Sequence, residues 1–85
     1  MATLEETELP GLGWKYVLRD TDAGDRFVLV THHGGKREVY RFAGDSDAPL
    51  DVFTLTEDEA RRFAAMLLGA VVAPSPRLRA APPPA

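Results

Sequence analysis

Cysteine is absent from this 85-residue sequence, which excludes disulfide bonds and thiolate metal sites. Long hydrophobic runs are also lacking: the longest, Phe63 to Ala73, has eleven residues, whereas a membrane-spanning helix needs about 20. The first residues, Met-Ala-Thr-Leu-Glu-Glu, are acidic and lack the apolar stretch of a secretory signal. We therefore expect a cytoplasmic protein of one domain, with no direct insertion into a membrane.

An excess of positive charge is lacking as well. Thirteen acidic residues against ten lysines and arginines give a net charge of −3, whereas nucleic-acid-binding domains are usually basic, with clustered cations and stacking aromatics. We therefore predict no nucleic-acid partner. The charge is uneven, because residues 26–44 carry a net +3 while residues 1–25 and 45–73 carry −4 each. Such a distribution favours pairing with an acidic partner surface or self-association.

Alternating apolar residues and turn residues predict an antiparallel sheet. Trp14, Tyr16 and Leu18 alternate with Lys15, Val17 and Arg19, and this period of two is typical of a half-buried strand. Gly34-Gly35 between two such segments indicates a hairpin. The segment 26–32 is apolar on both faces, as a central strand would be. The predicted strands are Thr3–Leu9, Gly13–Arg19, Arg26–His32, Lys36–Phe42 and, as a short fifth strand, Val52–Leu55.

A helix is predicted after the last strand. Thr56-Glu57-Asp58-Glu59 has the form of a capping box, with three acids at the positive end of the helix dipole. Pro74 forbids continuation of the helix. The apolar positions of its predicted core-facing side are Ala60, Phe63, Ala64, Leu67 and Val71.

The predicted fold class is therefore α+β, with a small antiparallel sheet of four to five strands followed by one C-terminal helix packed on one face. The domain would span residues 3–73. Because the central strand is apolar on both sides, a second copy of the chain would cover the other sheet face, giving a homodimer. Residues 74–85 contain five of the seven prolines and are predicted to form a proline-rich disordered tail.

Catalytic chemistry finds little support in the sequence. The acidic clusters fit turns and helix capping, and Gly11-Leu12-Gly13 is followed by neither a Lys-Ser/Thr pair nor a helix that could hold a phosphate. Adjacent histidines on a strand point to opposite faces, so His32 and His33 are poorly placed to ligate one metal. We predict that the protein is not an enzyme and binds no cofactor or metal.

The predicted hairpin carries the remaining candidate residues. Histidine changes charge near neutral pH, which makes His32 and His33 candidates for pH sensing. The full set of candidate pH-sensing or partner-contact residues is His32, His33, Lys36, Arg37 and Tyr40. An alternative interpretation is a small ligand-binding or enzymatic site near the His32–Tyr40 hairpin, formed by His33, Glu38 and Tyr40.

Three blocks together resemble one family. They are Glu-Thr-Glu-Leu-Pro-Gly-Leu-Gly at residues 6–13, Val-Thr-His-His-Gly-Gly-Lys-Arg-Glu-Val-Tyr at 30–40 and Leu-Thr-Glu-Asp-Glu-Ala at 55–60. In order and spacing they are similar to the N-terminal domain of potassium/proton antiporter regulatory subunits of the KhtT type, over residues 5–70.

The resemblance implies a non-enzymatic cytoplasmic regulatory subunit that associates with a membrane cation/proton antiporter, at the inner face of the plasma membrane, and modulates its activity. Family members are typically dimers in which a TrkA C-terminal domain, which binds ligands such as cyclic dinucleotides, follows this one. Here a proline-rich segment follows residue 73, so we do not expect that ligand sensing to carry over. A second interpretation is an orphan dimerisation domain without a transporter partner.

Overall fold

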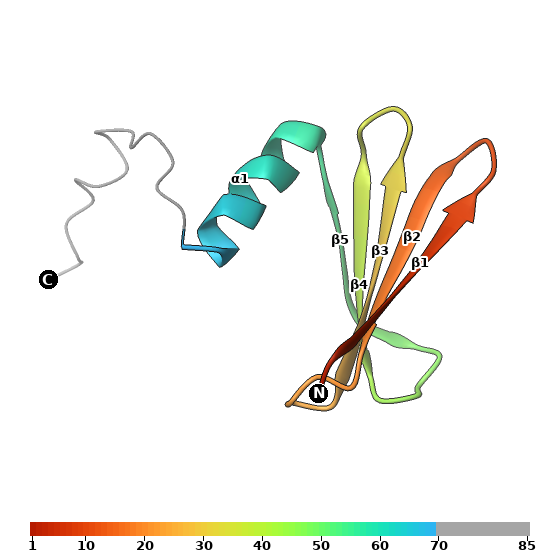
Figure 1. The fold of residues 1–85 in the computed structure, drawn as a ribbon, viewed down its shortest axis with the longest axis vertical. Helices are drawn as coiled ribbons and strands as arrows, with labels where there is room; N and C mark the ends of the chain where they lie inside the picture. The colour runs from red at the N-terminus through yellow and green to blue at the C-terminus, as the bar shows by residue number, and fades with distance from the viewer. Residues whose placement is uncertain (70–85) are drawn as a thin grey trace, which may run out of the picture.

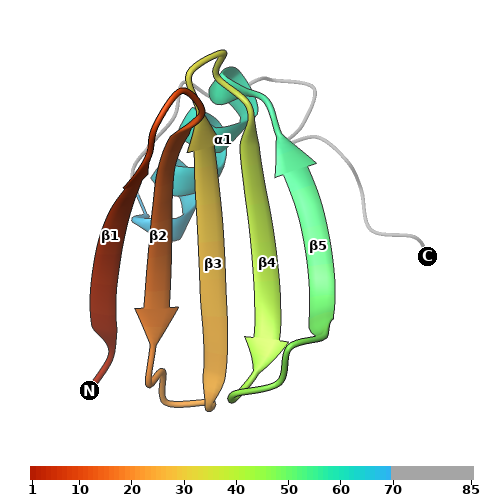
Figure 2. The same cartoon turned by 90° about the vertical axis from the view of Figure 1, so that its right-hand side faces the viewer.

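The computed structural model describes residues 1–69, as a five-stranded antiparallel sheet followed by one helix. Strands that are neighbours in the sequence are neighbours in the sheet, in the order β1-β2-β3-β4-β5 (Figures 1 and 2). This arrangement confirms the predicted α+β class. The elements are β1 Thr3–Leu9, β2 Gly13–Arg19, β3 Asp25–His32, β4 Arg37–Ala43, β5 Pro49–Leu55 and α1 Glu57–Leu67.

The fifth strand is longer than the sequence pattern indicated. It begins at Pro49 rather than Val52, and its pairing with β4 shifts register between Arg41 and Phe42. Proline lacks a backbone N–H, but at the first residue of an edge strand this donor is not needed for the ladder. The irregular pairing also explains why residues 49–51 do not fit a simple alternating pattern.

Strand register divides the apolar side chains between two faces. Tyr16 pairs with Leu29, and Leu29 with Val39, while Val17 pairs with Val28 on the opposite side. The predicted alternation in residues 14–19 is therefore confirmed. We name as the helix-side face the surface formed by Leu4, Tyr16, Leu18, Phe27, Leu29, Val39, Phe53 and Leu55. The far face is formed by Val17, Val28, Val30, Tyr40, Phe42 and Val52.

Two glycines shape the end of the sheet where the β1–β2 and β3–β4 turns lie. An ideal Cβ built on Gly13 would stand 1.7 Å from the carbonyl oxygen of Thr31, so only glycine allows β2 to start this close to β3. Gly35 has φ +104° in the β3–β4 hairpin, and its N–H donates to the His32 carbonyl oxygen at 2.9 Å. The predicted Gly34-Gly35 hairpin is thus confirmed.

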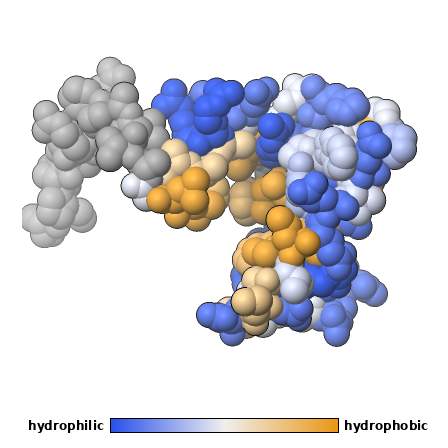
Figure 3. All heavy atoms as spheres, viewed as in Figure 1, coloured by the Kyte–Doolittle hydropathy of each residue, from blue (hydrophilic) through white to orange (hydrophobic). Residues whose placement is uncertain are grey.

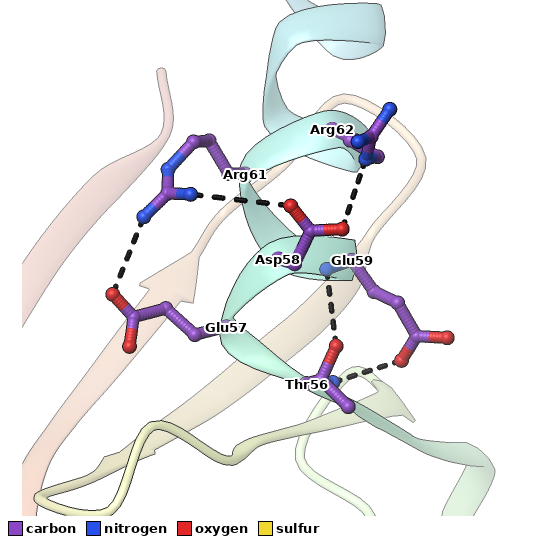
Figure 4. A network of polar contacts seen from close by, with 6 residues as sticks. All are labelled: Thr56, Glu57, Asp58, Glu59, Arg61 and Arg62. Atoms are coloured by element: carbon purple, nitrogen blue, oxygen red, sulfur yellow. Dashed lines mark hydrogen bonds and ion pairs between the residues drawn. The ribbon is translucent and has the colours of Figure 1, made fainter.

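The predicted capping box is present at the start of α1 (Figure 4). The Glu59 N–H donates to Thr56 Oγ1 at 3.1 Å, and the Thr56 N–H donates to Glu59 Oε1 at 2.9 Å. These two bonds satisfy backbone donors that a helix N-terminus otherwise leaves free. The helix ends at Leu67, ahead of Gly69 at φ +71°. The predicted helix position Val71 and the predicted tail lie outside the described residues.

Little apolar surface is buried within residues 1–69. Val17, at 6% exposure, is the one hydrophobic residue among them that is buried. The helix packs on the edge strand β5, where the Phe63 and Phe53 rings meet edge to face at 6.2 Å. From that contact α1 extends away from the sheet (Figure 1). The helix therefore lies on one side of the sheet, as predicted, while much of the helix-side face stays uncovered.

Candidate functional site

The β3–β4 hairpin places three polar side chains in contact on the far face. His32 Nε2 lies 2.6 Å from Glu38 Oε1, and the Tyr40 hydroxyl donates to Glu38 Oε2 at 3.2 Å. Strand register produces the cluster: Glu38 pairs with Val30, so His32, two residues further along β3, is its diagonal neighbour. The His32 and Glu38 side chains are 18% and 27% exposed. We call these three residues the hairpin cluster.

Hydrogen bonding and partial burial shift the pKa values of Glu38 and Tyr40 within the hairpin cluster. The bond from His32 is the main cause that lowers the pKa of Glu38; partial burial opposes it, and Tyr40 and the charge of Lys36 assist. Burial and the neighbouring Glu38 carboxylate raise the pKa of Tyr40. At neutral pH Glu38 is therefore an ionised acceptor and Tyr40 a protonated donor.

The other predicted contact residues lie around the hairpin cluster rather than in it. His33 is exposed in the turn, and its backbone N–H donates to the Leu12 carbonyl oxygen at 2.9 Å. Lys36 is exposed in the same turn, whereas Arg37 lies on the helix-side face and donates to the Gly35 carbonyl oxygen at 2.6 Å. The five residues predicted as contact sites are thus distributed over the turn and both sheet faces.

Two details of the sequence interpretation are corrected by this geometry. The alternative site joined His33 to Glu38 and Tyr40, but His32 is the histidine that contacts Glu38, because His33 has left the strand. Glu38 was also missing from the predicted contact set, although it connects His32 with Tyr40. The signal that could have identified it is the two-residue offset across a hairpin whose turn is Gly34-Gly35.

An apolar groove lies between the helix-side face and α1. It has a cavity volume of about 580 Å³ and reaches from Leu4 on β1 to Phe63 and Leu67 on α1. The space-filling view shows hydrophobic surface on the sheet and on the underside of the helix, facing each other across an open notch (Figure 3). Its polar lining residues are Arg37, Glu57 and Arg61. Such a surface suits an apolar protein segment better than a polar substrate.

Charged side chains on the sheet are largely engaged with one another. Arg41 contacts Asp25 at 2.9 Å and Asp51 at 2.6 Å, and these two carboxylates raise the pKa of its guanidinium. On the far face the Arg26 guanidinium lies 4.4 Å from the centre of the Phe42 ring. These contacts join β3, β4 and β5 and rigidify the sheet on which both candidate surfaces are built.

The described residues contain neither a group of metal-ligating side chains nor a helix that could cross a membrane. Within residues 1–69, no three histidine, aspartate or glutamate side chains are grouped so that they could hold a metal ion. Over the same residues, α1 is too short and too polar to cross a membrane. What the described residues do offer is a hydrogen-bonded polar cluster beside a turn and a wide apolar groove.

Comparison with known proteins identifies relatives among antiporter subunits. The family model described as "K(+)/H(+) antiporter subunit KhtT, N-terminal domain" matches residues 2–71. The K(+)/H(+) antiporter subunit KhtT of Bacillus subtilis (strain 168) is 38% identical over 72 residues, which cover 84% of this chain and 43% of that protein. The ammonium/H(+) antiporter subunit AmhM of Alkalihalophilus pseudofirmus is 42% identical over 69 residues, which cover 80% and 41%.

The aligned regions thus span less than half the length of these relatives. In this chain the family model matches residues 2–71, which include all five strands and α1. The resemblance indicated by the three sequence blocks is confirmed. The chain belongs to the family of the KhtT N-terminal domain.

Proposed function

We propose that this chain is a non-enzymatic regulatory subunit that associates with a membrane cation/proton antiporter and modulates its transport. The observation that carries the proposal is the family match, because two relatives are named as subunits of a K(+)/H(+) and an ammonium/H(+) antiporter. The exposed apolar surface supports it, since such surface is typical of modules that act by binding other proteins. The protein would work in the cytoplasm, held at the inner face of the plasma membrane by its partner.

The turn end of the sheet is the contact site that we propose for the antiporter. His33 and Lys36 are exposed there, and the hairpin cluster lies directly behind them. Protonation of His32 would add a positive charge next to Glu38, with Lys36 and Lys15 as the neighbouring cations. A partner that distinguishes the two charge states would then bind in a pH-dependent way.

Transport in everted membrane vesicles tests the proposed function. Vesicles from cells that express a K(+)/H(+) or an ammonium/H(+) antiporter, the two kinds named for the relatives, are prepared with and without this chain and loaded with a pH-sensitive dye. K⁺ and NH₄⁺ are then added separately, and the rate of proton release is measured. We expect the chain to change the rate for at least one cation. Equal rates, together with failure of the chain to sediment with antiporter-containing vesicles, would contradict the proposal and favour an orphan dimerisation domain.

Single variants of the two histidines test the pH input. His32→Gln removes the charge change inside the hairpin cluster, whereas His33→Gln changes an exposed side chain in the same turn. We expect the pH dependence of transport control, measured from about pH 6 to 8.5, to be lost in His32→Gln. It should remain in the control Arg62→Gln, an exposed cation on α1 that lies outside the hairpin cluster. Identical pH profiles for His32→Gln, His33→Gln and the parent would remove both histidines from the mechanism.

A further inference from the structure

The two edges of the sheet differ in how open they are to a further strand. β1 and β5 are the edge strands, since each has one neighbour in the sheet (Figure 2). Every residue of β1, from Thr3 to Leu9, pairs with β2 in an unbroken register, and within residues 1–69 no other segment pairs with β1. The outer side of such a strand presents a row of backbone N–H and C=O groups that can pair with another chain. We call this outer side the β1 edge.

The outer side of β5 is less suited to an additional strand. β5 begins with Pro49, which has no N–H to donate, and its pairing with β4 shifts between Arg41 and Phe42. α1 follows without a loop, because Thr56 is already the N-cap, and packs on the same strand through Phe63. Proline, irregular pairing and a covering helix are features by which natural sheets protect an edge. β1 contains no proline and no register shift, so its edge is the more open of the two.

Charge along β1 favours one kind of strand. Glu6 and Glu8 are exposed, lie on the helix-side face with Leu4, and form no ion pair with another residue of the range 1–69. Glu5, on the far face, is already paired with Arg19 at 3.0 Å. Opposite charges directly across a strand pair stabilise it, whereas like charges destabilise it. A matching strand therefore carries cations opposite Glu6 and Glu8 and an apolar residue opposite Leu4.

The same charges disfavour a second copy of the chain at this edge. Full antiparallel overlap of two β1 strands places Glu6 opposite Glu6. A shift by one residue places Glu5 opposite Glu6 or Glu8, and a shift by two places Glu5 opposite Glu5 or Glu6 opposite Glu8. Each of these registers sets a glutamate against a glutamate, which destabilises the pair. The β1 edge thus suits a strand of different and basic sequence.

We propose that the β1 edge binds an extended, basic segment of the antiporter as an additional strand of the sheet. This inference rests on the proposed function and names the chemistry of the partner at one surface. Backbone hydrogen bonds along β1 supply the binding, and the two unpaired carboxylates select a strand with cations at alternate positions. Cytoplasmic loops of membrane proteins are enriched in lysine and arginine, so a subunit held at the inner face of the membrane meets segments of this kind.

The β1 edge is continuous with the turn end of the sheet that we propose as the antiporter contact. β1 ends at Leu9, where the β1–β2 turn begins, and the carbonyl oxygen of Leu12 in this turn accepts the His33 N–H at 2.9 Å. A partner segment that follows β1 therefore reaches the exposed histidine of the neighbouring turn. One contact supplies strand pairing and the other the pH-dependent charge.

Synthetic peptides test the edge without the antiporter. The peptide Thr-Lys-Val-Lys-Thr-Val-Thr, capped at both ends, places lysines opposite Glu8 and Glu6 and a valine opposite Leu4 when it pairs antiparallel with β1. In NMR titrations of the full chain, we expect it to bind and to slow the amide hydrogen exchange of alternate β1 residues about tenfold or more. A peptide with glutamate in place of both lysines should bind at least about ten times more weakly.

N-methylation separates strand pairing from simple charge attraction. Two further basic peptides are N-methylated on one or the other set of alternating residues, which keeps their charge and removes the backbone donors of one side. We expect the peptide whose methyl groups face β1 to lose binding, while the peptide whose methyl groups face away keeps it.

Charge reversal on the chain gives a matched pair of variants. Glu6→Lys/Glu8→Lys changes the β1 edge, whereas Asp45→Lys/Asp47→Lys changes the net charge equally in the β4–β5 loop; all four side chains are exposed, so both variants should fold. The first should bind the basic peptide about tenfold or more weakly and prefer the acidic one. The second should behave like the parent. In sedimentation with antiporter-containing vesicles, the bound fraction should fall in the first variant alone.

Several results would overturn the inference. They are a basic peptide that fails to bind at millimolar concentration, equal binding by both methylated peptides, or slowed exchange on β5 instead of β1. Protection of the β1 amides in the free chain that is lost on dilution would assign the edge to a second copy. If Glu6→Lys/Glu8→Lys sediments with the vesicles as the parent does, the edge does not bind the antiporter, although the proposed function stands. Failure of the parent itself to sediment contradicts the proposed function, whatever the peptides show.

Discussion

Replacing Thr56 with alanine should lower the free energy of unfolding by about 1 kcal/mol, within the usual ~0.5–2 kcal/mol for loss of an N-cap. The substitution removes the oxygen that accepts the Glu59 N–H at 3.1 Å, so this donor must turn to water. The reciprocal bond, from the Thr56 N–H to Glu59 Oε1 at 2.9 Å, can still form, but the Thr56 side chain no longer helps to orient it. Both bonds are exposed to solvent, which keeps the loss near the middle of the range.

Urea denaturation provides the assay, with circular dichroism reporting α1 and the fluorescence of Trp14 reporting β2. In thermal unfolding, about 1 kcal/mol corresponds to a midpoint lower by roughly 4–8 °C for a domain of this size. Parent and variant must be compared at the same protein concentration, because self-association raises apparent stability. Thr56→Ser keeps the acceptor and should behave like the parent. An unchanged midpoint in Thr56→Ala would refute the assignment of Thr56 as a stabilising cap.

Three further substitutions test other parts of the structure. Gly13→Ala should destabilise by about 2 kcal/mol or more, since its Cβ would stand 1.7 Å from the Thr31 oxygen; parent-like stability in urea would contradict that close approach. Arg41→Met should lower the free energy of unfolding slightly at low salt and less at high salt, whereas a salt-independent loss would argue against its two ion pairs. The pKa of Glu38 is held below its ordinary 4.5, so its stabilisation is complete above that pH and is lost as the pH falls through the lowered value. Glu38→Gln should therefore flatten the acid side of the stability curve, and an equally steep acid loss would exclude Glu38.

The elements that the sequence predicted well are those fixed by neighbouring residues. The capping box needs only Thr56 and Glu59, three positions apart, and both of its bonds are present. The Gly34-Gly35 turn is similarly local and is found between β3 and β4. Where a long-range contact changes the backbone, as in the register shift beside Arg41, the pattern misplaced the start of β5 by three residues.

The candidate site was harder to predict from the sequence, because it depends on how the strands pair and on the angle between α1 and the sheet. The predicted strand already ended at His32, but choosing His32 rather than His33 as the partner of Glu38 also required the register in which Glu38 pairs with Val30. The open groove could not be predicted, because the amphipathic pattern of α1 implies an apolar contact but not the angle at which the helix leaves β5. That angle depends on packing at Phe53, which belongs to a strand whose boundaries were themselves uncertain from the sequence.

The three blocks that carried the family resemblance meet at one end of the molecule (Figure 1). Residues 6–13 contain the end of β1 and the β1–β2 turn, residues 30–40 contain the β3–β4 hairpin, and residues 55–60 contain the end of β5 and the start of α1. The His33 N–H donates to the Leu12 carbonyl oxygen, which joins the first block to the second. Glu57 lies against Gly35, which joins the second block to the third. These two contacts hold the exposed turn at His33 and the start of α1 in fixed positions relative to the sheet.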